Sequence, residues 1–411
     1  MDFDIAVVGG GPAGLCFARS LAGTGLRIAI LEQQDEAALA DPPYDGREIA
    51  LTHFSARLLR ELGLWDRFAA GEVAPLRDAH VLNGPQGRAA MRIEPGRAGK
   101  AELGYLVSNH VIRRAAYESV RDLDDVRLLC ATGVAGLRAE SDAVTIAIED
   151  GNRLAARLVV AADSRYSSTR RTAGIPASMY DFGKTMVVCR MAHDRPHGQV
   201  ACEWFDYGLT MALLPLNGNR TSVVLTAPET RARRLIAMPE AAFEREVEAR
   251  LGGRLGALRL ESARIPYPLV GVYAERFAAP RLALIGDAAV GMHPVTAHGF
   301  NFGLRGQWTL AREIRAALRA GEDIASPALL ARYEREHREA TRGLFLATQA
   351  LVRLYTTDTP LARLLRDAGL RIGERLGPFK QALVETLTEE GERPGALLRA
   401  ASRIAALAPL R

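Results

Sequence analysis

Several features are scarce or missing in this sequence, and each shortage narrows what the protein can be. The 411 residues include four cysteines, none of them in a Cys-x-x-Cys pair, which argues against a disulfide framework or a structural zinc site. No apolar run reaches ten residues, whereas a transmembrane helix needs about 20. The N-terminus lacks the basic stretch of a signal peptide, so we expect a cytoplasmic protein.

Lysine is almost absent, although the chain is basic. There are 53 basic and 48 acidic residues, for a net charge of +5, and only Lys100, Lys184 and Lys380 are lysines. No basic stripe with interleaved aromatic residues appears, so we expect no nucleic-acid partner. A proline separates His193 from His197 and disfavours a shared helical face, so we expect no metal site there. The composition is that of a globular protein, and the length suggests two or three domains.

The first 32 residues predict a dinucleotide-binding site. A β-type run over 3–8 leads into a glycine-rich turn, a helix follows over 15–21, and a strand over 27–31 ends at an acidic residue. The glycines allow a tight turn, close approach of the backbone to a pyrophosphate and packing of the helix on the strand, while the acid can bind a ribose hydroxyl. The predicted contacts are Gly9, Gly11, Ala13, Gly14 and Glu32. This motif does not separate FAD from NAD.

Two later apolar strands each deliver an aspartate. Asp163 follows the strand over 158–162, and Asp287 follows the strand over 281–285. An acceptor fixed at a strand tip suits the hydroxyl groups of a ribityl chain. The helix that begins near Gly299 would aim free N–H groups at a ligand, and the negative charge of a reduced flavin would be stabilised there.

In this order and spacing, the motifs resemble the flavoprotein aromatic hydroxylases of the p-hydroxybenzoate hydroxylase type over residues 1–340. Segments at 46–51, 62–65, 193–197 and 212–216 are similar to the UbiH/UbiF/VisC family of ubiquinone-biosynthesis hydroxylases. Within that family, the stretches DGREIALTH, AADSRYS, DFGKTMVVCRM and GMHPVTAHGFNFGLRGQ most resemble the UbiM-type 5-demethoxyubiquinol hydroxylases.

The resemblance implies an FAD-dependent monooxygenase that takes electrons from NAD(P)H and an oxygen atom from O2, through a C4a-hydroperoxide of the flavin. Its substrate would be the aromatic ring of a polyprenylated phenol or quinol, held in an apolar tunnel. Two alternatives stay open: an FAD-dependent isoprenoid or quinone reductase or dehydrogenase, and a non-catalytic FAD-bound scaffold in a biosynthetic complex. No second Gly-x-Gly-x-x-Gly with a following buried strand appears, which argues against a separate nicotinamide domain.

The resemblance also implies roles for individual residues. Arg47 would contact the FAD pyrophosphate, and Asn109 would lie near the flavin. Asp287 would hold ribityl or pyrophosphate oxygens, and Asp163 of the second motif would belong to the cofactor site. The residues expected at the isoalloxazine are Pro294 against its face and Gly299, Phe300 and Asn301 at its pyrimidine end.

The sequence departs from the family at two positions. The second motif usually reads Asp-Gly, but Ser164 follows Asp163 here, which puts in question the unusual backbone angles that glycine allows. His298 stands where the family often has glutamine. An imidazole beside a flavin is a candidate proton handler, so we name His298 and Pro294 as candidate catalytic residues. The alternative role of His298 is a hydrogen-bonding substitute for glutamine.

The expected fold is α/β, with a Rossmann-like FAD-binding domain of the p-hydroxybenzoate hydroxylase type, an antiparallel-sheet substrate domain and a helical C-terminus. The FAD-binding domain would comprise 1–73, 101–177 and 273–340, the substrate domain 74–100 and 178–272, and the helical region 341–411. Helices are expected over 49–64, 109–120, 238–251, 302–320 and 326–350, and antiparallel strands over 184–228.

The C-terminal tail is a candidate contact surface. After Gly395 it places leucines among arginines, a pattern that suits the surface of the inner membrane or a partner in a ubiquinone-biosynthesis complex. Packing against the rest of the chain is the alternative. The apolar positions of the helix over 344–355 belong to the core or to a homodimer surface.

Overall fold

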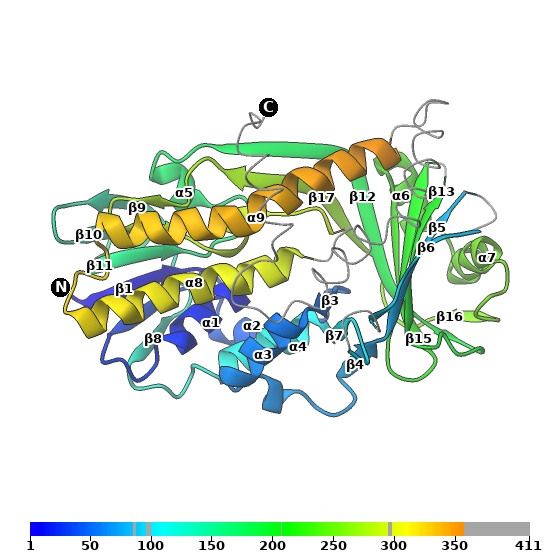
Figure 1. Ribbon diagram of the computed structural model, residues 1–411, viewed down its shortest axis with the longest axis horizontal. Coiled ribbons are helices and arrows are strands. Elements are labelled where there is room, and N and C mark those ends of the chain that lie inside the picture. Colours follow the sequence, from blue (N-terminus) through cyan, green and yellow to red (C-terminus); the bar gives the residue numbers. More distant parts are fainter. Residues whose placement is uncertain (85–87, 96–99, 207, 295–297, 357–411) are drawn as a thin grey trace.

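The strands form three sheets in the part of the chain that the structure describes. The computed structural model describes residues 1–84, 88–95, 100–206, 208–294 and 298–356. In Figure 1, helices α8 (Gly299–Ala320) and α9 (Pro327–Thr356) run side by side along the half that holds the N-terminus, and a second, larger sheet stands at the opposite end. The α/β fold expected from the sequence is confirmed.

The eight-stranded sheet contains the dinucleotide-type unit. Its strand order is β18-β19-β11-β1-β2-β8, and β10 and β9 extend it from β11 by antiparallel pairing. β1 pairs in parallel with both β11 and β2, and these strands are apolar because both of their faces are covered. The strands are β1 (Phe3–Val8), β2 (Ile28–Leu31), β8 (Val126–Leu129), β9 (Val134–Ala139), β10 (Val144–Ile148), β11 (Arg153–Ala161), β18 (Ala278–Ala279) and β19 (Leu282–Leu284).

Helices enclose this sheet and complete the main core. α1 (Pro12–Ser20) connects β1 to β2 and packs against α8 and against α4 (Asn109–Glu118), which in turn contacts α2 (Glu36–Ala40). The short helix α5 (Ser168–Thr172) follows β11 and lies near β9.

The nine-stranded sheet forms the other end of the molecule. Its order is β20-β17-β12-β15-β14-β13-β5-β6, with β16 paired to β12, and the β13–β5 pairing is parallel. The strands are β5 (Asp78–Asn83), β6 (Arg88–Ile93), β12 (Ala177–His193), β13 (Val200–Asp206), β14 (Leu209–Pro215), β15 (Arg220–Pro228), β16 (Leu258–Leu260), β17 (Ile265–Ala274) and β20 (Val290–Gly291). The antiparallel strands expected over 184–228 are therefore present.

The two faces of this sheet have different neighbours because side chains alternate along each strand. One face carries residues such as Trp204, Met211 and Leu225, which pack with α6 (Glu229–Ala237) and α7 (Glu240–Leu251) in a separate core. Figure 1 shows α7 on the outer side of this sheet, away from the N-terminal half. The opposite face is turned toward the first sheet and lines a cavity.

The third sheet corrects one sequence prediction. The helix expected over 49–64 begins only at His53, because β3 (Glu48–Leu51) pairs with β7 (Gly104–Ser108), which also pairs with β4 (Val73–Leu76). Thr52 caps the helix, since its Oγ1 accepts a hydrogen bond from the Ser55 amide at 3.2 Å. The helix itself is α3 (His53–Glu61), and the turn η1 (Trp65–Arg67) follows.

The helix predicted over 238–251 is present as α7, which begins at Glu240. No helix was predicted over α6, which precedes α7 and is separated from it by a break at Met238 and Pro239. Helix α8 begins at Gly299, as expected from the third motif, and so includes three residues before the range 302–320. Helix α9 extends to Thr356. Residues 357–411, with the tail after Gly395, lie outside the described residues. Within the described residues, no helix is long and apolar enough to cross a membrane.

Candidate active site

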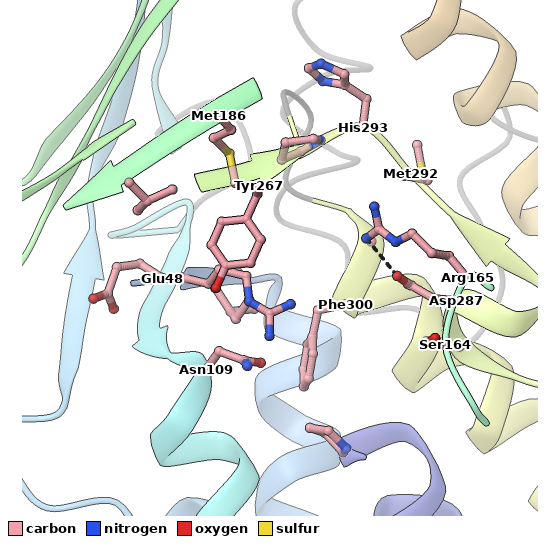
Figure 2. A pocket seen from close by; sticks show the side chains of 18 of the residues that line it. Glu48, Asn109, Ser164, Arg165, Met186, Tyr267, Asp287, Met292, His293 and Phe300 are labelled. Atoms are coloured by element: carbon pink, nitrogen blue, oxygen red, sulfur yellow. Dashed lines mark hydrogen bonds and ion pairs between the residues drawn. The ribbon is translucent and has the colours of Figure 1, made fainter. Parts of the chain in front are cut away.

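A cavity of about 790 Å³ lies between the first sheet and the inner face of the nine-stranded sheet. Figure 2 shows Ser164, Asp287 and Phe300 on one side of it and Glu48, Met186 and Tyr267 on the other. The loops that follow β1, β2, β11 and β19 all reach this cavity. The carboxyl ends of parallel strands are the usual ligand site of such sheets, and the predicted cofactor motifs lie there.

The glycines of the first loop have separate tasks. Gly9 has a φ of +110°, and a Cβ there would lie 2.6 Å from the Ala162 carbonyl oxygen. A Cβ on Gly14 would collide with the Gly9 carbonyl oxygen. Gly11, by contrast, lines the cavity, and apart from its chain neighbours no described atom lies within 4 Å of its Cβ position. Gly9 and Gly14 therefore allow the packing, and Gly11 leaves room for a ligand.

Helix α1 points its N-terminus at the same space. Its N-cap is Gly11, no described side chain caps it, and a proline occupies its first turn. The first amides of a helix have no partner within the helix, and the positive end of the helix dipole lies there. Ala13 lines the cavity beside them. This arrangement suits a pyrophosphate.

Glu32 follows β2 and lines the same end of the cavity. Its two oxygens accept hydrogen bonds from the Gly10 amide at 2.6 Å and the Gln34 amide at 2.8 Å. These bonds fix the carboxylate next to the glycine loop. The remaining lone pairs of a carboxylate can accept hydrogen bonds from ribose hydroxyls.

Asp45 joins two predicted cofactor residues, although no motif in the sequence indicates it. Its Oδ2 accepts hydrogen bonds from Arg47 Nη2 at 2.6 Å and from Asn109 Nδ2 at 2.7 Å. Tyr267 Oη donates to the Asp45 carbonyl oxygen at 2.5 Å. Burial alone would raise the pKa of Asp45 and lower that of Arg47, but their ion pair reverses both shifts. Arg47 and Asn109 both line the cavity.

The second and third motifs meet through an ion pair. Arg165 Nη2 donates to Asp287 Oδ2 at 2.9 Å, as the dashed line in Figure 2 shows. Asp163 turns away from the cavity lining: its Oδ2 accepts from the Thr169 amide at 3.0 Å and its Oδ1 accepts from Ser167 Oγ at 2.5 Å, which anchors α5. Ser164 lies on the lining.

The start of α8 forms another part of the wall. Gly299 and Phe300 line the cavity. Apart from its chain neighbours and the backbone of its own helix, no described atom lies within 4 Å of a Cβ position on Gly299. The side chain of Asn301 serves the fold, because its Nδ2 donates to the Ala50 carbonyl at 2.8 Å and its Oδ1 accepts from the Thr52 amide at 3.1 Å. A contact between Asn301 and the flavin therefore stays a prediction, and it concerns the backbone atoms of Asn301, because its side chain binds Ala50 and Thr52.

The two candidate catalytic residues have different surroundings. Pro294 is exposed and lines the cavity. His298 is buried at the N-cap of α8, its ring lies 5.7 Å from that of Phe302, and it is not part of the cavity lining. His293, beside Pro294, does line the cavity, and burial, with Lys184 nearby, lowers its pKa to about 4. A neutral His293 is therefore expected at physiological pH.

The inner face of the nine-stranded sheet forms the wall that was expected from the strands over 184–228, but the sequence analysis named none of its residues. Strands β12 to β15 present mostly apolar or small side chains to the cavity: Met186, Val188, Glu203, Phe205, Thr210, Ala212, Leu214, Val224 and Thr226. From β3, Glu48 also lines it. Arg190 Nη2 donates to Glu48 Oε1 at 2.7 Å, and Ser108 Oγ donates to Glu48 Oε2 at 2.7 Å. Burial nevertheless raises the pKa of Glu48.

These residues fit an FAD molecule. The open spaces at Gly11 and Gly299 lie at the N-termini of α1 and α8, where no hydrogen bond from a described side chain caps the helix. An acidic side chain follows β2 where a ribose would lie. The polar loops surround one part of the cavity, and the apolar sheet surrounds the other. One cavity thus combines a dinucleotide site with space for an apolar ligand.

Known proteins match both the sequence and the fold. Residues 2–347 match the family model of the FAD binding domain. The chain is 46% identical over 393 residues to the ubiquinone hydroxylase UbiM of Neisseria meningitidis, covering 94% of this chain and 84% of that protein. It is 38% identical to the ubiquinone hydroxylase UbiL of Rhodospirillum rubrum, with 92% and 87% covered. The solved p-nitrophenol 4-monooxygenase PnpA from Pseudomonas putida matches with a TM-score of 0.74 at 20% identity, covering 94% and 98%.

The likeness to PnpA concerns the fold, whereas the sequence matches establish the family. The family and the fold class predicted from the sequence are confirmed, and so is FAD as the cofactor. The chain therefore belongs to the family of FAD-binding hydroxylases that includes the ubiquinone hydroxylases UbiM and UbiL.

Proposed function

We propose that this protein is an FAD-dependent monooxygenase that uses NAD(P)H and O2 to hydroxylate the aromatic ring of a polyprenylated phenol or quinol in ubiquinone biosynthesis. One observation carries the proposal: a single cavity extends from the glycine loop at Gly11 to the apolar inner face of the nine-stranded sheet. The names of the relatives UbiM and UbiL support a ring of the ubiquinone type.

The chain's own residues bind and orient the two molecules. The N-termini of α1 and α8 and the carboxylate of Glu32 would hold FAD, which, when bound, supplies the reducing electrons and the transfer of an oxygen atom. The strands β12 to β15 would hold the ring, and their apolar side chains would exclude water from the reacting centre. Positioning of the ring against the flavin is then the main contribution of the protein.

The finer assignment follows the family resemblance. The preferred substrate is a demethoxyubiquinol-type ring hydroxylated at C5, with hydroxylation at more than one ring position as the alternative. NAD(P)H would visit the FAD-binding part transiently, because the sequence carries no second dinucleotide motif. Pro294 would face the isoalloxazine, and the tail after Gly395 would contact a membrane or a biosynthetic complex.

The decisive experiment measures oxygen consumption together with the products. Purified FAD-loaded protein is given NAD(P)H and a short-chain demethoxyquinol, and the ring products are identified by mass spectrometry. Oxygen uptake that matches the amount of hydroxylated ring supports the proposal. Quinone reduction without oxygen incorporation would instead identify a reductase, and the absence of any turnover would favour the scaffold. Quinone intermediates in a deletion strain, with and without this protein, test the same assignment in cells.

A further inference from the structure

Glu203 is a carboxylic acid on an otherwise apolar wall. It lies on β13 and lines the cavity. By register, Glu203 is opposite Ala212 of β14 on one side and Val81 of β5 on the other. Ala212 is in turn opposite Val224 of β15, and Val224 is opposite Val188 of β12. Since paired residues share a face of the sheet, Glu203 stands in a row of aliphatic side chains.

The neighbouring row on the same face has no charged group between β5 and β12. It begins at Asn83 of β5, which is opposite Phe205. Four residues follow across β13, β14, β15 and β12, in the order Phe205, Thr210, Thr226 and Met186. All four line the cavity. By register, the polar groups of this row are thus the amide of Asn83 and the hydroxyl groups of Thr210 and Thr226. No described side chain donates a hydrogen bond to the Glu203 carboxyl group.

Charged groups lie farther along this face and across the cavity. Lys184 and Arg190 belong to the same face of β12, and Arg190 is held by Glu48. Arg47, Glu48 and His293 line the cavity from other elements. Burial alone raises the pKa of Glu203 to about 8, whereas Glu48 has an arginine that opposes the same effect. Among the described residues, no cation forms an ion pair with Glu203, which lies in the part of the cavity where an apolar ring would lie.

A raised pKa matches the chemistry of a phenol. A phenol such as tyrosine has a pKa near 10, and an ordinary glutamic acid has a pKa near 4.3. The difference of about six pKa units makes proton transfer from the phenol to the carboxylate strongly unfavourable. With the pKa of Glu203 at about 8, the difference between the pKa values of the phenol and the carboxyl group falls to about two units. A base whose pKa lies near the working pH is the efficient kind in general base catalysis.

Resting on the proposed function, we propose that Glu203 accepts the proton of a ring hydroxyl of the substrate and so activates the ring for hydroxylation. The O–H bond of the ring breaks, the proton passes to a carboxylate oxygen of Glu203, and the electron pair stays on the phenolate oxygen. One oxygen atom of O2 is transferred to the ring carbon, and the other is reduced to water by the two electrons of NAD(P)H, which becomes NAD(P)+. The ring carbon then loses its hydrogen as a proton to solvent, and aromaticity returns. The phenolate oxygen then regains a proton from Glu203, which becomes a carboxylate again.

The test compares Glu203→Gln and Glu203→Asp with the parent, all loaded with FAD, on a short-chain demethoxyquinol between pH 6 and 10. The parent is expected to show kcat/KM for ring hydroxylation rising with pH until Glu203 ionises. Glu203→Gln should lose this rise and about a hundredfold of kcat/KM at pH 8, since general base catalysis contributes about 10²–10⁴-fold. The deficit should shrink toward pH 10, where the substrate ionises by itself. Glu246→Gln, on α7 behind the sheet, is the matched control and should behave as the parent.

The outcomes separate this inference from the proposed function. A parent that hydroxylates the ring, beside a Glu203→Gln variant with the same pH dependence and rate, overturns the role of Glu203 alone. A Glu203→Gln variant that is impaired equally at every pH also overturns it, since a purely structural role gives that result. If Glu203→Gln does not fold, the pH profile of Glu203→Asp is the test. A kcat/KM that still rises with pH supports the inference, and a kcat/KM that no longer rises contradicts it. A parent that never hydroxylates the ring overturns both.

Discussion

At the scale of single residues, Ser164 has a backbone conformation that residues other than glycine rarely adopt. Its φ is +74°, in the left-handed region that favours glycine. The second motif of the family usually has glycine at this position, whereas this chain has serine. The structure shows that Ser164 keeps the glycine-type conformation. Because Ser164 lies on the cavity wall between Asp163 and Arg165, it holds this conformation at the candidate site itself.

Replacing Ser164 with glycine should stabilise the folded protein. The left-handed conformation costs a non-glycine residue about 1–2 kcal/mol. Glycine removes this cost, but its greater conformational freedom in the unfolded chain offsets about 0.5–1 kcal/mol of the gain. The net gain in the free energy of unfolding should be about 0.5–1 kcal/mol, measured by urea denaturation. Ser164→Ala keeps the strained φ and should show no such gain. Equal stability of Ser164→Gly and Ser164→Ala would show that the backbone relaxes without glycine.

Glu32 offers a test of the cofactor site at the same scale. Glu32→Ala removes an acceptor for the ribose and the two bonds that hold the Gly10 and Gln34 amides. A charge-assisted hydrogen bond contributes about 1.5–3 kcal/mol, so FAD should dissociate about ten to a hundred times more readily. Fluorescence of released flavin gives the dissociation constant. Unchanged affinity in a folded variant would reject Glu32 as the ribose contact.

Local motifs were readable from the sequence, but partners distant along the chain were not. The glycine loop and Glu32 were predicted because the βαβ motif fixes their spacing within about 30 residues. Asp45, Arg165 and Glu203 carried no such signal, since their importance depends on which strands meet around the cavity. Asn301 was predicted as a ligand contact, yet its side chain binds Ala50 and Thr52, about 250 positions earlier.

At the scale of secondary-structure elements, the packing of α8 on α9 depends on a glycine and a histidine. A Cβ on Gly306 would lie 2.7 Å from His337 Nε2, so the absence of a side chain lets α9 approach. His337 is buried and stacks on Tyr333. Burial, and next the positive charge of Arg305, lower the pKa of His337 to about 3. The helices were predicted from their periodicity, but this contact was not, because no local pattern indicates which residue a glycine faces.

The buried imidazole predicts how stability changes with pH. In the unfolded chain His337 has a pKa near 6.5 and takes up a proton below it, whereas in the folded protein it stays neutral until about pH 3. Its contribution to stability is thus complete above pH 6.5 and is lost as pH falls. Between pH 6 and 4 the free energy of unfolding of the parent should fall more steeply than that of His337→Gln, by about 1.4 kcal/mol per pH unit. Chemical denaturation at several pH values measures both slopes.

The comparison between parent and variant is needed because Glu203 acts in the opposite direction. Its raised pKa makes the folded state bind a proton that the unfolded state releases, so its contribution grows as pH falls from about 8. This effect is present in both proteins and cancels in the difference. Identical slopes would show that His337 takes up its proton in the folded state and is not enclosed between α8 and α9.

At the scale of the whole molecule, the cavity links the two large sheets. Its wall includes Gly11 after β1 and Asp287 after β19 from the first sheet, and Met186 and Glu203 from the second. A ligand that fills it contacts both, so cofactor binding and the stability of the folded chain are coupled. Because a ligand that binds only the folded state adds RT ln(1 + [L]/Kd), FAD at a hundred times its Kd should add about 2.7 kcal/mol.

Gly11→Val should separate the stability of the fold from the binding of FAD. The backbone at Gly11 is extended, with a φ of −74°, and no atom lies within 4 Å of its Cβ position, so valine fits the protein without FAD and its Tm should equal that of the parent. The side chain then occupies the space at the N-terminus of α1 where the pyrophosphate would bind. The parent should gain thermal stability when FAD is added, and Gly11→Val should gain none. Gly71→Val is the matched control, because that position is equally open, has no positive φ and is not part of the cavity lining, and it should respond to FAD as the parent does. A Gly11→Val protein that is stabilised by FAD as strongly as the parent would mean that the cofactor does not approach the helix at this glycine, and the assignment of the first loop to the pyrophosphate would have to be abandoned.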